Sequence, residues 1–339
     1  MKMFDAYKEF VLKNKNAKPS VQLIPIPEKQ YSFQYVGGQI YENKLYSIVN
    51  SAEKMLTYDI NKDDFSFLGQ FEKTDFKWTG GCVFKDVLYL FPRSSKCLLA
   101  YHLKTCAFEN IDCGFLYEGE HHYGGVCTPN GFVYQPPRNT DHILKWDLKN
   151  KSCEKIVISE GDKFRYCGSV LHPNGFLYFF PEQDLPIIKM NVKTHSITLI
   201  DCPKECFTFD PTIAADGNIY AFSARKGIIK IDTKTDTVSV FYGERRMGAY
   251  GTKAGVNGKL YSLPGYTNEM LEFDPFTGEL KECFSMSQKR KVHYAGGAVD
   301  VNGDIYALPV HADEILKISF DDFTDEIPKD LYAFFNDCY

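Results

Sequence analysis

The sequence predicts an all-β fold built from seven copies of one four-stranded unit, and three observations lead to this prediction. An aliphatic–tyrosine pair recurs every 41 to 45 residues, a short turn precedes each pair, and a small-residue start precedes each turn. Repetition at a nearly constant spacing indicates stacked structural units. The tyrosines of the seven pairs are Tyr46, Tyr89, Tyr134, Tyr178, Tyr220, Tyr261 and Tyr306.

Each copy contains the same elements in the same order. In the last copy, "YAGG" is the small-residue start, "DVNG" the turn, "IYALP" the apolar strand and "ILKISF" the next alternating strand. Asn-Gly and Asp-Gly between apolar runs favour hairpins. Four strands in 40–45 residues, repeated seven times, predict a seven-bladed β-propeller with strands A to D running outward from the axis. Glycines in strand A then fit the crowded axis, and the proline ends strand B.

With these motifs, the chain resembles the β-propeller superfamily and is closest to kelch-type repeats. The resemblance covers nearly the whole chain and rests on pairs such as Leu88-Tyr89, with Gly80-Gly81 standing before the pair, whereas in kelch repeats a Gly-Gly follows it. Because propellers carry binding, catalytic and scaffold functions, the resemblance implies the fold and leaves the function open.

Composition narrows the class of protein. The 339 residues are 44% apolar and 15% aromatic, with a formal net charge of −5, so no overall basic surface for nucleic acid is expected. The start "MKMFDAYKEFVLKNKN" has no apolar core of a signal peptide, and no apolar run is long enough to span a membrane. We therefore expect a cytoplasmic protein with no membrane partner, whose eleven cysteines are reduced.

The two ends of the chain are expected to pack on the propeller. Residues 1–18 form an amphipathic helix and linker, residues 19–320 form the propeller, and residues 321–339 form a C-terminal segment packed on it. The segment Val21 to Ile26 is predicted to supply the outer strand that the seventh copy lacks, beside Ile315 to Phe320, which would remove an open sheet edge. The N-terminal helix packs on the propeller or docks a protein partner.

The arginines are predicted to share one face. In an up-and-down blade, the B–C loops and the D-to-A connections lie at the same end. Arg93, Arg138 and Arg225 fall in B–C loops, and the remaining four arginines fall in D-to-A connections: Arg165, Arg245, Arg246 and Arg290. Arginine binds carboxylate or phosphate with a planar fork, so this face favours an anionic ligand. The alternative is a polar rim whose arginines pair with nearby carboxylates.

Alignment of the strand A starts predicts two rings of side chains at the mouth of the axial channel. One ring is Gln34, Lys77, His121, Arg165, Thr208, Ala249 and His293. The ring beside it packs between blades or offers a stacking surface, and consists of Tyr35, Trp78, His122, Tyr166, Phe209, Tyr250 and Tyr294. The predicted ligand-binding set is Lys77, Trp78, Arg93, His121, His122, Arg138, Arg165, Glu182, Arg225, Arg245, His293 and His311.

Three functional hypotheses follow. The first is binding of an anionic small molecule, an acidic glycan or an acidic peptide at the axial mouth, without a cofactor. The second is a lyase, hydrolase or epimerase acting on an acidic sugar, with His121, His293 or Tyr294 as the base and arginine clamps. In a variant of it, His121, His293 and His311 hold a metal with Glu182 or Glu120, although no metal-binding spacing supports this. The third is a protein-interaction scaffold.

Overall fold

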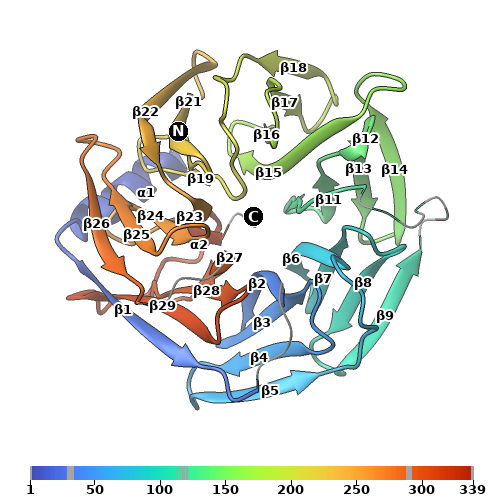
Figure 1. Cartoon of the computed structure of the whole chain (residues 1–339), viewed down its shortest axis with the longest axis horizontal. Helices are drawn as coiled ribbons and strands as arrows, with labels where there is room; N and C mark the ends of the chain where they lie inside the picture. The colour runs from blue at the N-terminus through green and yellow to red at the C-terminus, as the bar shows by residue number, and fades with distance from the viewer. Residues whose placement is uncertain are drawn as a thin grey trace.

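A computed structural model describes residues 2–28, 34–112, 114, 116, 119, 121–287 and 292–336 of the chain. These residues form seven antiparallel sheets around a central axis, as Figure 1 shows. In each blade one strand lies nearest the axis, and the other strands of the blade follow outward. The strands nearest the axis are β2 (Tyr35–Tyr41), β6 (Trp78–Phe84), β10 (Val126–Cys127), β15 (Phe164–His172), β19 (Thr212–Ile213), β23 (Ala249–Ala254) and β27 (Tyr294–Val299). The seven-bladed β-propeller predicted from the repeat is therefore confirmed.

Four of the blades consist of strands that are consecutive in the sequence. Blade 1 contains β2 (Tyr35–Tyr41), β3 (Lys44–Val49), β4 (Met55–Asp59) and β5 (Asp64–Leu68). Blade 2 contains β6 (Trp78–Phe84), β7 (Val87–Pro92), β8 (Cys97–His102) and β9 (Ala107–Asp112). Blade 5 contains β19 (Thr212–Ile213), β20 (Ile219–Phe222), β21 (Lys226–Asp232) and β22 (Thr237–Arg246). Blade 6 contains β23 (Ala249–Ala254), β24 (Leu260–Pro264), β25 (Glu269–Phe273) and β26 (Leu280–Ser285).

The loop of blade 3 contributes one short strand to the sheet of blade 4. Blade 3 contains β10 (Val126–Cys127), β11 (Phe132–Gln135), β13 (His142–Asp147) and β14 (Ser152–Val157). Its B–C loop forms β12 (Arg138–Thr140), which pairs with the innermost strand of blade 4. Blade 4 otherwise contains β15 (Phe164–His172), β16 (Phe176–Pro181), β17 (Ile187–Asn191) and β18 (Ile197–Ile200). The repeat pattern did not predict β12, because this strand lies inside a loop.

The N-terminal strand closes the ring. Blade 7 contains β27 (Tyr294–Val299), β28 (Ile305–Pro309) and β29 (Glu314–Asp321), and its outer strand is β1 (Lys18–Pro25). The pairing of β1 with β29 is antiparallel and sets Val21 opposite Ile318 and Ile24 opposite Ile315. The predicted closure is confirmed. The side chain of Ile24 belongs to the core cluster shared with blades 1 and 2, while Val21 packs against the cluster of blades 4 to 7.

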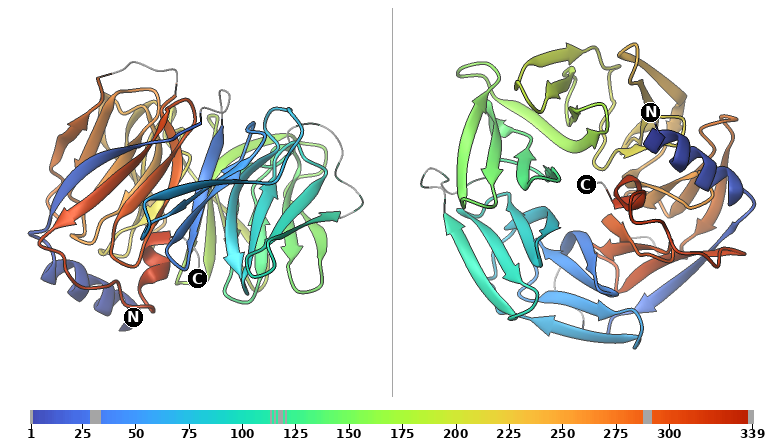
Figure 2. Two further views of the ribbon diagram at one scale, coloured as in Figure 1. Left: turned by 90° about the horizontal axis from the view of Figure 1, so that it is seen from below. Right: turned by 180° about the vertical axis from the view of Figure 1, so that it is seen from behind.

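Both helices of the described chain lie on the face opposite the arginines. The helices are α1 (Lys2–Lys13) and α2 (Tyr332–Asn336), and Figure 2 shows them together at one end of the ring. Tyr7 stacks on Phe334, with ring centroids 4.4 Å apart, and Val11 contacts the A–B turn of blade 6 at Gly258. The predicted N-terminal helix is thus packed on the propeller. The described residues include no helix long and apolar enough to cross a membrane.

Glycines allow the innermost strands to approach one another. Gly37, Gly80, Gly124 and Gly296 all have positive φ angles, between 62° and 92°. A Cβ atom added at Gly80 would lie 3.1 Å from the Cα of Gly124, and one added at Gly296 would lie 2.9 Å from the Cα of Gly37. An L side chain at these positions would meet both backbone strain and a neighbouring strand. This is the crowding that the sequence predicted for strand A.

Candidate functional site

The strand register identifies the residues that face the axis. In each blade the strand B tyrosine pairs with one strand A residue, for example Gln39 with Tyr46 and Val126 with Tyr134. Position 36 and its equivalents, three residues before that partner, line the axis. They are Val36, Thr79, Tyr123, Cys167, Phe209, Tyr250 and Ala295.

The predicted rings therefore need a correction. Tyr35, Tyr166 and Tyr294 are buried in the core between blades, because successive side chains of a strand point to opposite sides. In blades 5 and 6 the predicted register was also wrong by one residue. Phe209 and Tyr250, which were predicted for the second ring, face the axis. Tyr123 was absent from both predicted rings, although the same alternation would have found it.

A cavity of about 140 Å³ lies at the axial mouth on the arginine face. We call it the arginine cavity. Its wall combines two guanidinium groups and one carboxylate with aromatic and aliphatic side chains. It is lined by Val36, Phe76, Arg93, Tyr123, Arg138, Glu182, Phe209, Tyr250, Ala295 and Val310.

The guanidinium group of Arg93 lies close to two aromatic rings. Its guanidinium carbon lies 4.0 Å from the ring centroid of Phe76 and 5.0 Å from that of Tyr123. Only 8% of the residue is exposed. Cation–π contacts of this kind gain strength when water is excluded, so the rings both orient the charge and offset part of the cost of burying it. Burial raises the pKa of Tyr123, and the two arginines act against this rise.

Arg138 and Arg165 share the carboxylate of Glu182. The exchanged strand β12 sets Arg138 opposite Arg165 across the blade boundary. Arg138 donates two hydrogen bonds to Glu182, and Arg165 donates two more, with Nε to Oε2 at 3.3 Å and Nη2 to Oε1 at 3.1 Å. The predicted alternative of arginines paired with local carboxylates is therefore present at these two positions. Arg138 still lines the cavity and lies 5.2 Å from the ring centroid of Tyr123.

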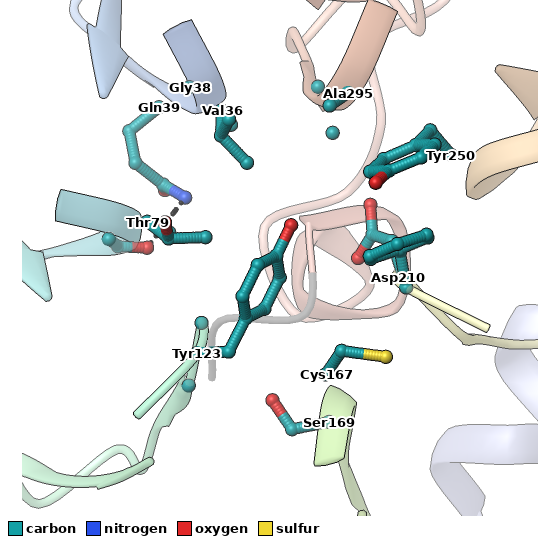
Figure 3. A pocket seen from close by; sticks show the side chains of 18 of the residues that line it. Val36, Gly38, Gln39, Thr79, Tyr123, Cys167, Ser169, Asp210, Tyr250 and Ala295 are labelled. Atoms are coloured by element: carbon teal, nitrogen blue, oxygen red, sulfur yellow. Dashed lines mark hydrogen bonds between the residues drawn. The ribbon is translucent and has the colours of Figure 1, made fainter. Parts of the chain in front are cut away.

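An aromatic collar separates the arginine cavity from the channel beneath it. Tyr123, Phe209 and Tyr250 line both spaces, and the rings of Phe209 and Tyr250 stack with centroids 3.6 Å apart. Figure 3 shows Tyr123 and Tyr250 projecting towards the axis, with Asp210 lining the same channel. Asp210 is bound by Lys253, whose Nζ lies 3.1 Å from Oδ2. Asn336 of α2 lines the same channel and donates a hydrogen bond to the carbonyl of Val299. The helix α2 therefore covers the end of the channel opposite the arginine cavity.

Lys77 and Trp78 do not line the arginine cavity. Both line a wider cavity of about 880 Å³ further from the axis, between the outer parts of blades 1 and 2. The Nζ of Lys77 donates to the carbonyls of Glu72 and Thr74, and burial lowers the pKa of Lys77 to about 8, opposed by nearby carboxylates. Trp78 donates its indole N–H to the carbonyl of Cys97. The main chain at Lys77 is near the mouth, but the side chain turns outward.

The predicted histidines separate into two groups. His121 and His122 line a cavity of about 270 Å³ beside blade 3, together with His142. His293 and His311 lie at blades 6 and 7, where His293 bonds Asn268 and His311 bonds the carbonyl of Val292. His121, His293 and His311 therefore do not converge, and within the described chain no three His, Cys, Asp or Glu side chains could hold a metal ion. The hypothesis that His121, His293 and His311 hold one metal ion is therefore not supported.

The other predicted residues lie outside the cavity. Arg225 and Arg245 are exposed on the arginine face, with Arg245 bound to Glu269 at 3.0 Å. Tyr294, a predicted base, is fully buried in the core. Glu120 and Arg290 are outside the described residues. Of the predicted ligand-binding set, the structure thus brings Arg93, Arg138 and Glu182 to one cavity, with Arg165 joined through Glu182.

Solved structures resemble nearly the whole chain. A structure described as a streptogramin B lyase is 15% identical, with a TM-score of 0.75 over 89% of this chain and 98% of that one. Virginiamycin B lyase from Staphylococcus aureus is 14% identical, with a TM-score of 0.73 over 89% and 99%. The WD40 propeller domain of Doa1 is 13% identical, with a TM-score of 0.67 over 91% and 98%.

These similarities define the class of protein as a seven-bladed β-propeller. At identities this low they show the fold alone. No protein-family profile and no curated protein sequence matches the chain. The kelch-type resemblance stays a prediction from sequence.

Proposed function

We propose that the protein binds the anionic group of a ligand in the arginine cavity. The ligand is a phosphorylated or carboxylated small molecule, an acidic glycan or an acidic peptide. Pockets that enclose a whole drug-sized ligand usually have volumes of about 300–1,000 Å³. The arginine cavity is smaller, at about 140 Å³. It therefore takes one phosphate or carboxylate, while the rest of the ligand lies over the arginine face.

One observation carries this proposal: Arg93 and Arg138 are both more than nine-tenths buried and line the same concave space. Burying a charge is costly unless the charge is compensated, so guanidinium groups are seldom placed this way for solubility. Arginine presents several N–H donors in one plane, which matches the oxygens of carboxylate and phosphate. The rings of Phe76 and Tyr123 contact Arg93 and restrict its side chain before a ligand arrives.

Glu182 neutralises part of the positive charge of the site. Its carboxylate faces Arg138 and Arg165 and offsets part of their charge. The lining residues then carry two guanidinium groups and one carboxylate. An anion entering from the mouth would bind on the Arg93 side, and Glu182 would keep Arg138 oriented from behind.

Calorimetric titration tests the proposal with inorganic phosphate, glucuronate and glucose 6-phosphate as probes. The variant is Arg93→Met, which keeps an apolar stem against Phe76 and removes the charge. The matched control is Arg246→Met, an exposed arginine on the same face. Loss of one charge-assisted hydrogen bond costs about 1.5–3 kcal/mol, so Kd should rise roughly 10- to 150-fold in Arg93→Met and stay unchanged in the control.

Two results would contradict the proposal. One is the same affinity in wild type and Arg93→Met. The other is no binding of any of the three probes at millimolar concentration. Circular dichroism of each variant shows whether the fold is intact. Binding should weaken only modestly as salt rises, because the guanidinium groups are largely buried.

A further inference from the structure

A second cavity beside blade 3 has a composition unlike the arginine cavity. It has a volume of about 270 Å³, and we call it the histidine cavity. Three imidazoles belong to its wall, together with two carboxylates and two ammonium groups. These side chains are His121, His122, His142, Asp141, Asp162, Lys155 and Lys163.

His122 is the most deeply buried of these groups, with 1% of its surface exposed. Burial lowers the pKa of His122 well below its usual value, and the nearby His142 and His121 act in the same direction. The imidazole is therefore neutral near pH 7. A neutral imidazole carries one N–H donor and one acceptor nitrogen.

The two ring nitrogens of His122 have different surroundings. The imidazole hydrogen-bonds to the main chain of His142, while Nε2 is buried and has no hydrogen-bond partner among the described residues. The bond to the main chain must then involve Nδ1. A bond that favours the charged form is one in which the ring donates, so Nδ1 carries the hydrogen and Nε2 is a bare acceptor. A buried acceptor without a donor destabilises the fold unless another molecule supplies one.

Among the histidines that the structure describes, His122 alone has a buried ring nitrogen with no hydrogen-bond partner. His172 is similarly buried on the opposite face, but both of its nitrogens are satisfied. Its Nε2 bonds the carbonyl of Gly217 at 3.1 Å, and its Nδ1 accepts from the N–H of Asn174 at 3.1 Å. The contrast points to a donor from outside the chain at His122.

The charges in the wall indicate what kind of molecule that donor belongs to. Asp141 and Asp162 offset Lys155 and Lys163, so the four formal charges cancel. Asp141 also accepts a hydrogen bond from His142 Nδ1, at 2.6 Å. A charge-balanced, polar wall favours a neutral molecule whose hydroxyl groups both donate and accept. The volume lies just below the range of about 300–1,000 Å³ for small-molecule pockets, which suits a compact ligand.

We infer that the histidine cavity binds a small neutral polyol or a monosaccharide, with one ligand hydroxyl donating a hydrogen bond to Nε2 of His122. This site is separate from the anion site, although His122 and Tyr123 are adjacent in the chain. The two residues point to opposite sides of the same segment, His122 to the histidine cavity and Tyr123 to the arginine cavity.

The test is a titration followed by ¹⁵N signals of the histidine side chains in the full-length protein. The probes are glycerol, myo-inositol and glucose, added separately, and Zn²⁺ in a parallel arm. The His122→Phe variant assigns the His122 signal. We expect at least one neutral probe to shift the Nε2 signal of His122 saturably, while both signals of His172 stay unchanged.

A variant on the rim keeps the test valid if His122→Phe does not fold. Lys163 is exposed and lines the cavity, so Lys163→Ala should leave the fold intact. Loss of one hydrogen bond predicts roughly a three- to ten-fold weaker affinity for the probe that binds. Lys193→Ala, an exposed lysine on the opposite face, is the control and should bind as wild type.

Three outcomes would overturn the inference. The His122 signal does not respond to any neutral probe, which would mean that an ordered water alone satisfies Nε2. It responds only to Zn²⁺, which would make the cavity a metal site. Or it shifts together with the His172 signals, which would indicate a general solvent effect.

Discussion

Ring closure by β1 can be tested at one side chain, Ile24. This residue is 5% exposed, lies opposite Ile315 and belongs to the core cluster shared by blades 7, 1 and 2. The substitution Ile24→Ala removes three carbon atoms, worth roughly 0.8 kcal/mol each, and leaves a cavity. We therefore expect the free energy of unfolding to fall by about 2–5 kcal/mol.

Equilibrium urea unfolding measures this loss, with Gln22→Ala as the control. Gln22 lies on the same strand but is exposed, so its substitution should change stability by less than about 0.5 kcal/mol. A double-mutant cycle of Ile24→Ala with Ile315→Ala should show a coupling of about 0.5–3 kcal/mol. If Ile24→Ala is as mild as Gln22→Ala and the coupling is zero, β1 does not close the ring.

Three further predictions concern the core, the site and the axis. Burial and the charge of Asp304 raise the pKa of Asp300 from 3.8 to about 6, so the folded state holds this proton more tightly than the unfolded state. The free energy of unfolding should therefore fall by about 3 kcal/mol as pH rises from about 4 to 6. Urea unfolding of Asp300→Asn should not show this fall. Glu182→Gln removes the carboxylate of the site and should strengthen phosphate binding in calorimetry, by roughly 2 kcal/mol, because one like charge near the anion is lost, while lowering thermal stability. Unchanged affinity would mean that Glu182 does not oppose the anion. Gly80→Ala should lower the unfolding free energy by at least about 1–2 kcal/mol, because φ is +72° and Gly124 is adjacent, and a neutral result would remove the crowding argument.

Much of the fold was predictable because the repeat fixes it. The strand B tyrosines repeat at nearly equal intervals, and each lies in the second strand of its blade. Closure was predictable because the seventh copy lacks an outer strand and Val21 to Ile26 has a strand pattern. The arginine face was predictable from topology, since antiparallel strands assign each loop to one end.

The side-chain directions within the site were harder to predict. In blades 5 and 6 the axial start has no Gly-Gly pair, so nothing in those segments anchors the register, and Phe209 and Tyr250 were placed one residue away. Glu182 was predicted at the site, but its bridge between Arg138 and Arg165 depends on β12 crossing to the next blade. That crossing is a tertiary contact, and the loop sequence carries no period that would reveal it.

The most direct test of the anion site is diffraction from crystals soaked in selenate, a tetrahedral anion whose selenium gives an anomalous signal. Selenate resembles phosphate in shape, and its oxygens accept hydrogen bonds from guanidinium groups. We predict the strongest anomalous peak inside the arginine cavity, within hydrogen-bond distance of Arg93 and Arg138. Peaks confined to surface lysines, with none in the cavity, would contradict the proposed function.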